Sequence, residues 1–291
     1  MAMKWSTWKL LDDNWAPTPR SLQETLDGGQ AFRWKFLEDE NLWQGIFGSH
    51  LCQLKQDSVN NKVSIRGYQW KAKDYNAANQ YFGCKIPWTQ IDDSLPWRSD
   101  AHLKACMDSF PELRILRQPF AETLLAFMCS ATKRIPQIKV MCQNLATELG
   151  NEIAPNTHAL PTWEQVAQAD ETSLRKLALG FRAKNIKKTA DIIAATPDLL
   201  QQVEDAPYDE AKELLLQLPG VGEKIADCAL LFGTTKQEAF PVDTWVIKVL
   251  SRRYGLDAWS NTQLSAFGRI HFGKNAGFAQ QYLFSWERAF G

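Results

Sequence analysis

The chain has 291 residues, of which 45% are hydrophobic and 23% are charged. These values exclude a disordered or fibrous protein, and the length suits one large globular domain or two modest ones. Thirty-three Lys and Arg residues balance thirty-three Asp and Glu residues, so no overall charge draws the molecule to nucleic acid or to an anionic membrane.

No segment carries the run of about 18 to 20 apolar residues that a bilayer span requires, and the first residues lack the apolar core of a signal peptide. We therefore expect a monomer that contacts no membrane and stays inside the cell, in the cytoplasm of a prokaryote or the nucleus of a eukaryote. The six cysteines form neither a C-x-x-C pair nor a Cys/His cluster. We expect reduced, mostly buried thiols and no cofactor.

The composition changes near residue 100. Eight of the twelve tryptophans precede that point, among alternating runs at 30–36, 42–47 and 63–65 that turn-like segments separate. Alternating apolar and polar residues with many aromatics indicate an antiparallel sheet. We therefore predict an N-terminal β-rich domain over residues 1–100.

From about residue 100 onward the pattern is helical. Residues 120–129 are typical of a buried helix, and prolines interrupt the rest of the chain at intervals. Strands followed by a run of helices indicate an α+β protein. The second domain is predicted to be all-helical over residues 101–291.

The segment 208–254 contains the most informative motif. An apolar helix must end at Pro219, because proline lacks the N–H and forces the preceding residue out of the helical region. Gly220, Val221 and Gly222 then form a turn before a second helix. Glycines permit positive φ and close approach of a ligand, and the free N–H groups at the helix start suit one phosphate. A plain helical corner is the alternative.

Lys224 and Asp243 are the candidate catalytic pair. Lys224 lies in the first turn of the second helix, where the positive end of the helix dipole favours the neutral, nucleophilic amine. Such an amine can form a Schiff base with a carbonyl-like carbon. Asp243 precedes a predicted helix over 244–254. Taken singly, the two residues are an ordinary surface lysine and an ordinary helix cap. Their occurrence together with the hairpin favours a catalytic role for both.

The strings LPGVGEKIADCALLFG and PVDTWVIKVLSRRY resemble the helix-hairpin-helix DNA glycosylase superfamily, in particular its 8-oxoguanine DNA glycosylase/AP lyase branch. GGQAFRW, LLAFMCSATKR, LALGFRAKNI and GFAQQYLFSWE resemble the same branch in the same order. The resemblance implies a bifunctional repair enzyme whose partner is duplex DNA with a damaged purine. It would flip out 8-oxoguanine, excise it by attack of Lys224 on C1′, and nick the strand by β-elimination, with Asp243 stabilising charge on the sugar.

The resemblance also implies a pocket for the flipped base. The backbone carbonyl of Gly29 would accept the N7 proton that 8-oxoguanine carries and guanine lacks. Gln280 and Phe284 lie on one helix face and would bond to the base edge and stack on its ring. Cys228, one turn after the nucleophile, would form the opposite wall.

Further residues match DNA contacts of the branch. Phe181 would enter the stack as a wedge, and Arg182 would meet the orphaned partner base. The segment 171–188 has six basic residues and one acidic residue, a local charge of about +5 that suits phosphates. An ordinary solvated helix face is the alternative, and acidic residues are expected away from the binding face.

Three expected DNA contacts depart from the best-known eukaryotic form. Thr132 stands where that form has a gap-filling asparagine, and Trp245 replaces a phosphate-contacting histidine. Gln137 aligns with the arginine that reads the opposite cytosine, although a slip of one residue in the alignment is open. Neutral residues in place of charged ones predict a weak preference for cytosine opposite the lesion.

Two alternatives remain. One is a helix-hairpin-helix glycosylase for another damaged base, such as an alkylated base or an oxidised pyrimidine. The nucleophilic Lys224 disfavours the monofunctional alkyl-purine type, and the absence of a C-terminal four-cysteine cluster disfavours the endonuclease III type. The other is a non-catalytic module that uses the hairpin only to bind DNA. A cation on the hairpin carbonyls is left open.

Overall fold

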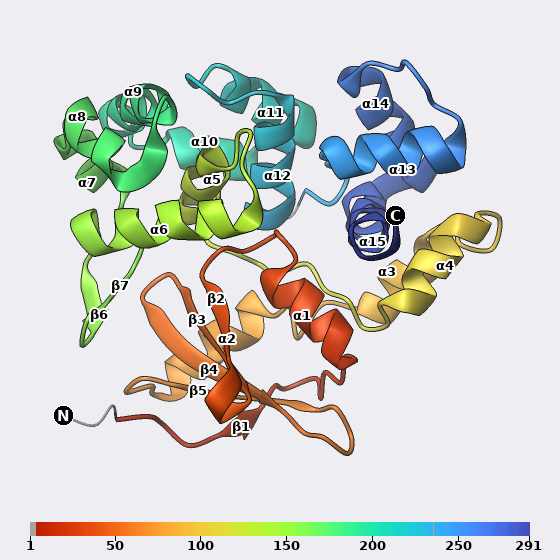
Figure 1. Cartoon of the computed structure of the whole chain (residues 1–291), viewed down its shortest axis with the longest axis horizontal. Helices are drawn as coiled ribbons and strands as arrows, with labels where there is room; N and C mark the ends of the chain where they lie inside the picture. The colour runs from red at the N-terminus through yellow and green to blue at the C-terminus, as the bar shows by residue number, and fades with distance from the viewer. Residues whose placement is uncertain (1–3, 235) are drawn as a thin grey trace.

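The computed structural model describes residues 4–234 and 236–291. A five-stranded sheet comes first in the chain, and a large helical region lies against it (Figure 1). The strand order is β1-β5-β4-β3-β2, and all neighbours are antiparallel. The strands are β1 (Lys9–Leu10), β2 (Trp34–Leu37), β3 (Leu42–Phe47), β4 (His50–Gln56) and β5 (Val63–Gly67). The predicted α+β class, a sheet followed by helices, is confirmed.

Strands β3 and β5 begin where the alternation predicted them, the run over 30–36 is a strand only from Trp34, and β1 and β4 were not predicted. From Trp43 to Phe47 the residues of β3 alternate between buried and partly exposed, as expected for a sheet with one covered face. Trp34 and Phe82 are among the buried aromatics of the core under the sheet. Helices α1 (Pro19–Asp27), α2 (Ala72–Tyr81) and α3 (Trp88–Ser94) also belong to the first hundred residues. The tryptophan-rich alternation did not indicate them.

The rest of the described chain is mainly helical. The predicted helices over 120–129 and 244–254 are both present with those bounds. A two-stranded ribbon and a π-helical turn interrupt the helices. The elements are α4 (Ala101–Ser109), α5 (Phe120–Cys129), α6 (Ile135–Leu149), β6 (Glu152–Ala154), β7 (Thr157–His158), α7 (Trp163–Gln168), α8 (Glu171–Leu174), the π-helical turn (Arg175–Leu179), α9 (Arg182–Ala195), α10 (Leu199–Asp205), α11 (Tyr208–Leu216), α12 (Glu223–Gly233), α13 (Thr244–Tyr254), α14 (Asn261–Phe272) and α15 (Ala276–Phe290).

Two hydrophobic cores lie under these elements. One is under the sheet, and the other joins the helices from Trp88 to Leu283. Helix α4 packs against α15 near the end of the chain. The domain boundary near residue 100 stays a prediction.

All six cysteines are buried and free, as the sequence predicted.

Among the described residues, no helix combines the length and the apolar character that crossing a bilayer requires.

Helix packing sets the frame of the site. Helix α12 packs along α5 and against α11, while α13 packs against α15. The two pairs stand side by side, with the sheet and α1 below them (Figure 1). Residues from the start, middle and end of the chain therefore meet there.

Candidate active site

The predicted hairpin joins α11 and α12. Gly220 has φ of +82°, and a Cβ at this position would approach Asn185 Cβ to 2.7 Å, so the turn requires glycine there. Gly222 faces open space, since a Cβ would meet nothing within 4 Å. Within the described chain no side chain caps the first turn of α12. Its first N–H groups are therefore available for an anion, as expected for a phosphate site.

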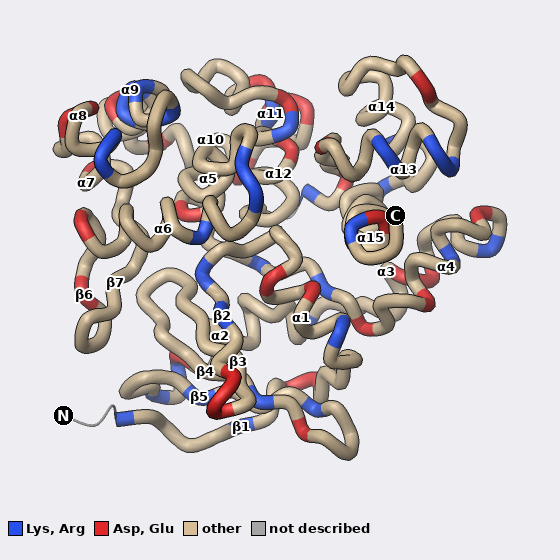
Figure 2. The backbone as a smooth tube through the Cα atoms, in the orientation of Figure 1, with Lys and Arg blue, Asp and Glu red and all other residues tan. Residues whose placement is uncertain are grey.

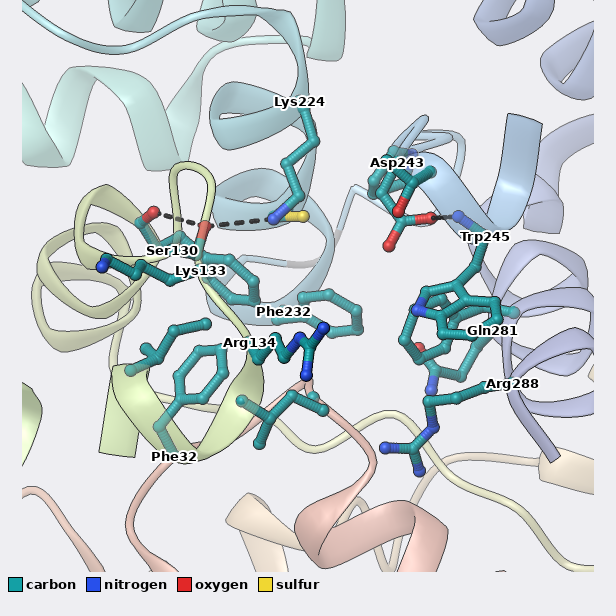
Figure 3. A pocket seen from close by; sticks show the side chains of 18 of the residues that line it. Phe32, Ser130, Lys133, Arg134, Lys224, Phe232, Asp243, Trp245, Gln281 and Arg288 are labelled. Carbon is teal, nitrogen blue, oxygen red and sulfur yellow. Dashed lines mark hydrogen bonds between the residues drawn. The ribbon is translucent and has the colours of Figure 1, made fainter. Parts of the chain in front are cut away.

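A cavity of about 650 Å³ opens between the hairpin helix, α5, α13 and α15 (Figure 3). It is large enough to take one flipped nucleotide. All six residues predicted for catalysis and base binding line it, although they are far apart in the sequence: Gly29, Lys224, Cys228, Asp243, Gln280 and Phe284. Trp245, predicted to contact DNA, lines it as well.

Lys224 reaches the cavity from α12. Its Nζ lies 3.1 Å from Ser130 Oγ and 5.1 Å from the centroid of the Phe127 ring. Cys228 lies one turn further along the helix, and burial raises the pKa of its thiol to about 12. The thiol is therefore neutral near pH 7, which suits a wall of the pocket better than a competing nucleophile.

Asp243 stands across the cavity from Lys224 (Figure 3). Its Oδ1 accepts hydrogen bonds from the backbone N–H groups of Trp245, at 3.0 Å, and Val246, at 2.9 Å. The carboxylate thus caps α13, as expected. Burial raises its pKa, although the capping N–H groups and nearby Lys224 oppose that shift. The same group is held rigidly by its helix and faces the proposed nucleophile.

The base-binding residues lie around the deeper part of the cavity. Gly29 has φ of +109°, and a Cβ there would lie 3.0 Å from Ile135 Cδ1 and 3.7 Å from Phe284 Cζ. Only 4% of Gln280 is exposed, and its Oε1 has no hydrogen-bond partner among the described residues. A buried acceptor without a partner costs free energy unless a ligand donates to it. Since Gln280 also lines the cavity, its amide is a candidate partner for a polar group of a ligand there.

The structure adds cavity residues that the sequence analysis missed. Ser130, Lys133, Arg134 and Arg288 all line it, and Figure 3 shows Arg134 between the two walls. Arg288 also donates a hydrogen bond to Glu24 on α1. The consecutive basic residues in ATKR could have indicated Lys133 and Arg134. Nothing in the local sequence points to Ser130 or Arg288, whose positions depend on helix packing.

Several predicted DNA contacts lie outside the cavity. Phe181 is 61% exposed, as a wedge requires. Arg182 is buried, with 4% exposed, and donates to Thr132 Oγ1 at 3.0 Å and to the carbonyl of Ala131. The Oε1 of Gln137 accepts from the backbone N–H of Arg134 at 3.2 Å and so closes the first turn of α6. The DNA-contacting roles of these residues stay predictions.

The segment 171–188 is not one continuous helix face. Helix α8 ends at Leu174, a π-helical turn follows, and α9 begins at Arg182. Ala178, inside that turn, has φ of +66°. The segment is therefore bent, and Phe181 lies between the turn and α9.

Charged residues are unevenly placed around the site. Figure 2 shows Lys and Arg on the segment before α6, on α9 and on α13, which border the hairpin and the cavity. The consecutive acidic residues Glu38, Asp39 and Glu40 lie in the sheet region. The expected separation of acidic residues from the binding face stays a prediction.

A buried ionic network holds the two hairpin helices together. Asp227 on α12, only 1% exposed, accepts from the Tyr208 hydroxyl at 2.6 Å and from Lys212 Nζ at 3.1 Å. Burial raises the pKa of the Asp227 carboxyl. Lys212 Nζ also lies 2.5 Å from Glu223 Oε2. The network fixes α12, and hence Lys224, relative to α11.

No group of three or more His, Cys, Asp or Glu side chains within residues 4–234 and 236–291 is arranged to hold a metal ion.

Two family descriptions match consecutive parts of the chain. Residues 16–124 match the 8-oxoguanine DNA glycosylase N-terminal domain. Residues 126–267 match the HhH-GPD superfamily of base excision DNA repair proteins. The first match includes strands β2 to β5 and Gly29, and the second includes the hairpin, Lys224 and Asp243.

Relatives extend the match over most of the chain. The N-glycosylase/DNA lyase of Saccharomyces cerevisiae is 32% identical over 269 residues, which cover 82% of this chain and 70% of that protein. The N-glycosylase/DNA lyase OGG1 of Arabidopsis thaliana is 28% identical, with 92% of this chain and 77% of that protein covered.

Solved structures agree with these relatives. The Clostridium acetobutylicum 8-oxoguanine glycosylase/lyase, in complex with double-stranded DNA containing cytosine opposite 8-oxoG, is similar with a TM-score of 0.87 and 31% identity over 99% of both chains. A 3-methyladenine DNA glycosylase from Archaeoglobus fulgidus has a TM-score of 0.75 at 17% identity, over 98% of this chain and 99% of that one, and shares the fold alone. The hairpin fold and the sequence matches together place the chain in the N-glycosylase/DNA lyase family.

Proposed function

We propose that this chain is a bifunctional DNA glycosylase/AP lyase that excises 8-oxoguanine from duplex DNA and then nicks the strand. The main support is that Lys224 and Asp243 face each other across one cavity. Gln280, whose buried Oε1 has no hydrogen-bond partner among the described residues, lines the same cavity. Similarity to the N-glycosylase/DNA lyases of Saccharomyces and Arabidopsis and to the Clostridium 8-oxoguanine glycosylase/lyase supports this activity.

Recognition begins with extrusion of the damaged nucleotide, because its C1′ is shielded inside the stack. The free N–H groups at the start of α12 bind one backbone phosphate. Gln280 Oε1 then accepts an N–H from the base edge, and the Phe284 ring stacks on the base. The carbonyl of Gly29 accepts the N7 proton of 8-oxoguanine, which distinguishes it from guanine.

The chemical steps use the amine and the carboxylate. Neutral Lys224 Nζ attacks C1′, and the bond from C1′ to the base breaks with its electron pair leaving on the base, which takes up a proton. Asp243 stabilises the positive charge that develops on the sugar. Loss of the amine proton and opening of the sugar ring convert the adduct into an imine. Removal of a C2′ proton then expels the 3′ phosphate and breaks the strand.

Borohydride trapping on a duplex with 8-oxoguanine opposite cytosine tests this proposal. The wild-type chain should give a covalent protein-DNA adduct, and Lys224→Gln should give none while still binding the duplex. Lys104→Gln is the matched control, because Lys104 lies on α4 in an exposed pair with Asp108. An adduct that persists in Lys224→Gln would place the nucleophile elsewhere. Binding by the wild type with neither adduct nor excision would support the non-catalytic module.

The alternative substrate is another damaged base. The Archaeoglobus likeness supports only the fold, and the amine of Lys224 favours a lyase over a monofunctional enzyme. Excision from duplexes that carry 8-oxoguanine, an alkylated purine or an oxidised pyrimidine separates the candidates. If the enzyme excises the alkylated purine or the oxidised pyrimidine faster than 8-oxoguanine, that base is the preferred substrate instead.

We further infer that the enzyme works as a monomer inside the cell, in the cytoplasm of a prokaryote or the nucleus of a eukaryote. One chain supplies all the cavity residues named above, which supports a monomer. Sedimentation of the protein with and without duplex checks the stoichiometry. A stable dimer in both conditions would overturn it.

A further inference from the structure

Ser130 lies at the end of α5, directly beside the proposed nucleophile. It is 7% exposed and lines the cavity. Its Oγ is 2.7 Å from the backbone carbonyl oxygen of Phe127 and 3.1 Å from Lys224 Nζ. The backbone N–H of Ser130 also donates to the Phe127 carbonyl, at 2.9 Å. These bonds hold the serine against the helix end.

The hydrogen atoms at this contact can be assigned by elimination. A serine hydroxyl has one hydrogen to donate and two lone pairs to accept. The Phe127 carbonyl has no hydrogen, so the short bond between them uses the hydroxyl proton of Ser130. The same oxygen therefore presents a lone pair to Lys224, and the lysine must donate one of its N–H groups.

This assignment determines how the amine is oriented. A neutral amine has two N–H groups and one lone pair, and only the lone pair attacks carbon. Lys224 Nζ also lies beside the Cys228 thiol and over the face of the Phe127 ring, with 5.1 Å to the centroid. The ring face attracts a cation but provides no directed acceptor, and a thiol sulfur is only a weak acceptor. The strongest directed acceptor that the lysine meets on this wall is thus the Ser130 oxygen.

We propose that Ser130 is the positioning residue of Lys224: by accepting one N–H of the amine, it turns the nitrogen lone pair into the cavity toward the sugar carbon. This inference rests on the proposed function, because it assigns an orientation to the same nucleophile. Ser130 itself forms no bond to the substrate. Its contribution is the geometry that a near-attack arrangement requires.

Single-turnover trapping on an abasic-site duplex tests the role without requiring base recognition. Ser130→Ala should slow imine formation about 10- to 100-fold, the range expected for a lost hydrogen bond to a charged or reacting group. Affinity for the duplex should not change, because the hydroxyl points to Lys224 and the helix end. Ser130→Thr keeps the oxygen on Cβ and should recover most of the rate. Ser21→Ala, which removes another fully buried serine hydroxyl, should match the wild type.

The pH profile separates orientation from a general structural effect. The serine oxygen accepts from the charged ammonium more strongly than from the neutral amine. Its removal should therefore move the acidic limb of the rate profile toward lower pH, even as the maximal rate falls. A merely structural role would lower the rate by the same factor at every pH. That result, with an unshifted limb, would overturn the proposal.

Three further outcomes are decisive. Ser130→Cys nearly preserves size and offers a weak acceptor, so it gives a folded comparison if the alanine variant is unstable; a rate equal to the wild type would overturn the positioning role. A wild-type protein that gives no adduct would defeat the proposed function. A wild-type protein that traps normally, beside a Ser130→Ala variant with an equal rate and profile, would defeat only the role of Ser130.

Discussion

The ammonium of Lys212 on α11 lies 2.5 Å from the carboxylate of Glu223, the first residue of α12. A free carboxylate at this position would stand beside the helix start that we propose binds a DNA phosphate. The pair therefore neutralises a charge that would otherwise repel the substrate. Lys212 joins the two hairpin helices and also keeps their anion site usable.

This relationship predicts a dependence between the two side chains. Lys212→Met should weaken binding of an undamaged duplex about three- to tenfold at low salt, because Glu223 is then unpaired near the phosphate. Adding Glu223→Gln should restore the affinity, whereas Glu223→Gln alone should change it little. Dissociation constants for the four proteins measure the coupling.

The control for that cycle is Lys104→Met, which removes an exposed lysine on α4. Unfolding curves show whether Lys212→Met has lost the fold, since Lys212 also contacts buried Asp227. If a folded Lys212→Met binds weakly and Glu223→Gln does not restore it, the role of Lys212 is structural and the electrostatic explanation is wrong.

Asp243→Asn should separate the two roles of Asp243. Asparagine also caps helices, so the free energy of unfolding should change by no more than about 1 kcal/mol. Turnover should fall about 100-fold or more, because the negative charge opposite Lys224 is lost. Urea unfolding and single-turnover excision measure the two effects. An unfolded variant would show that the cap dominates.

The opposite-base preference should be weak. Gln137 is neutral and its Oε1 is bonded to the backbone of its own helix, while Thr132 is bonded to Arg182. Neither residue offers a charged donor to a cytosine edge. Excision rates on duplexes with each of the four bases opposite the lesion should lie within about tenfold of one another. A cytosine preference of about a hundredfold or more would contradict this expectation.

Stability should depend on pH through Asp92. Burial raises the pKa of this carboxyl to about 6, although the hydroxyl of Tyr282 donates a hydrogen bond to it. A raised pKa in the folded state means that the fold binds the proton more tightly than the unfolded chain does. This contribution is therefore fully present below the ordinary value near 4 and is lost as the pH rises to about 6.

Asp92→Asn should remove that dependence, because the amide oxygen still accepts from Tyr282 but does not ionise. The difference in unfolding free energy between the variant and the wild type should therefore depend on pH. At pH 7.5 this difference should favour the variant by about 1 kcal/mol or more beyond its value at pH 4. Urea unfolding at the two pH values checks the difference. The exposed neighbour Asp93, paired with Arg98, provides the control in Asp93→Asn. An equal change in both variants would exclude Asp92 as the cause.

Local features of the site could be predicted because they depend on nearby residues. Pro219 excludes continuation of the helix, although α11 already ends at Leu216, before the predicted end at Pro219. Gly220 supplies the positive φ of the turn. The spacing of four residues places Lys224 and Cys228 on one helix face. Asp243 before α13 was predicted to be its cap, and the structure shows that cap. Chain order and helical periodicity are sufficient for these statements.

The remaining features required the packed molecule. The helices α1, α2 and α3 were not predicted, because the tryptophan-rich alternation around them indicated strands. The sequence did not indicate that Arg182 is buried against Ala131 and Thr132; its contact with DNA stays a prediction.

The decisive contacts at the site join distant segments: Ser130 meets Lys224 across 94 positions, and Arg288 meets Glu24 across 264. Local backbone preferences act over a few residues, whereas such contacts arise only when whole helices exclude water and settle against one another. The sequence therefore indicated the candidate nucleophile and its hairpin, and helix packing determined how that lysine is held.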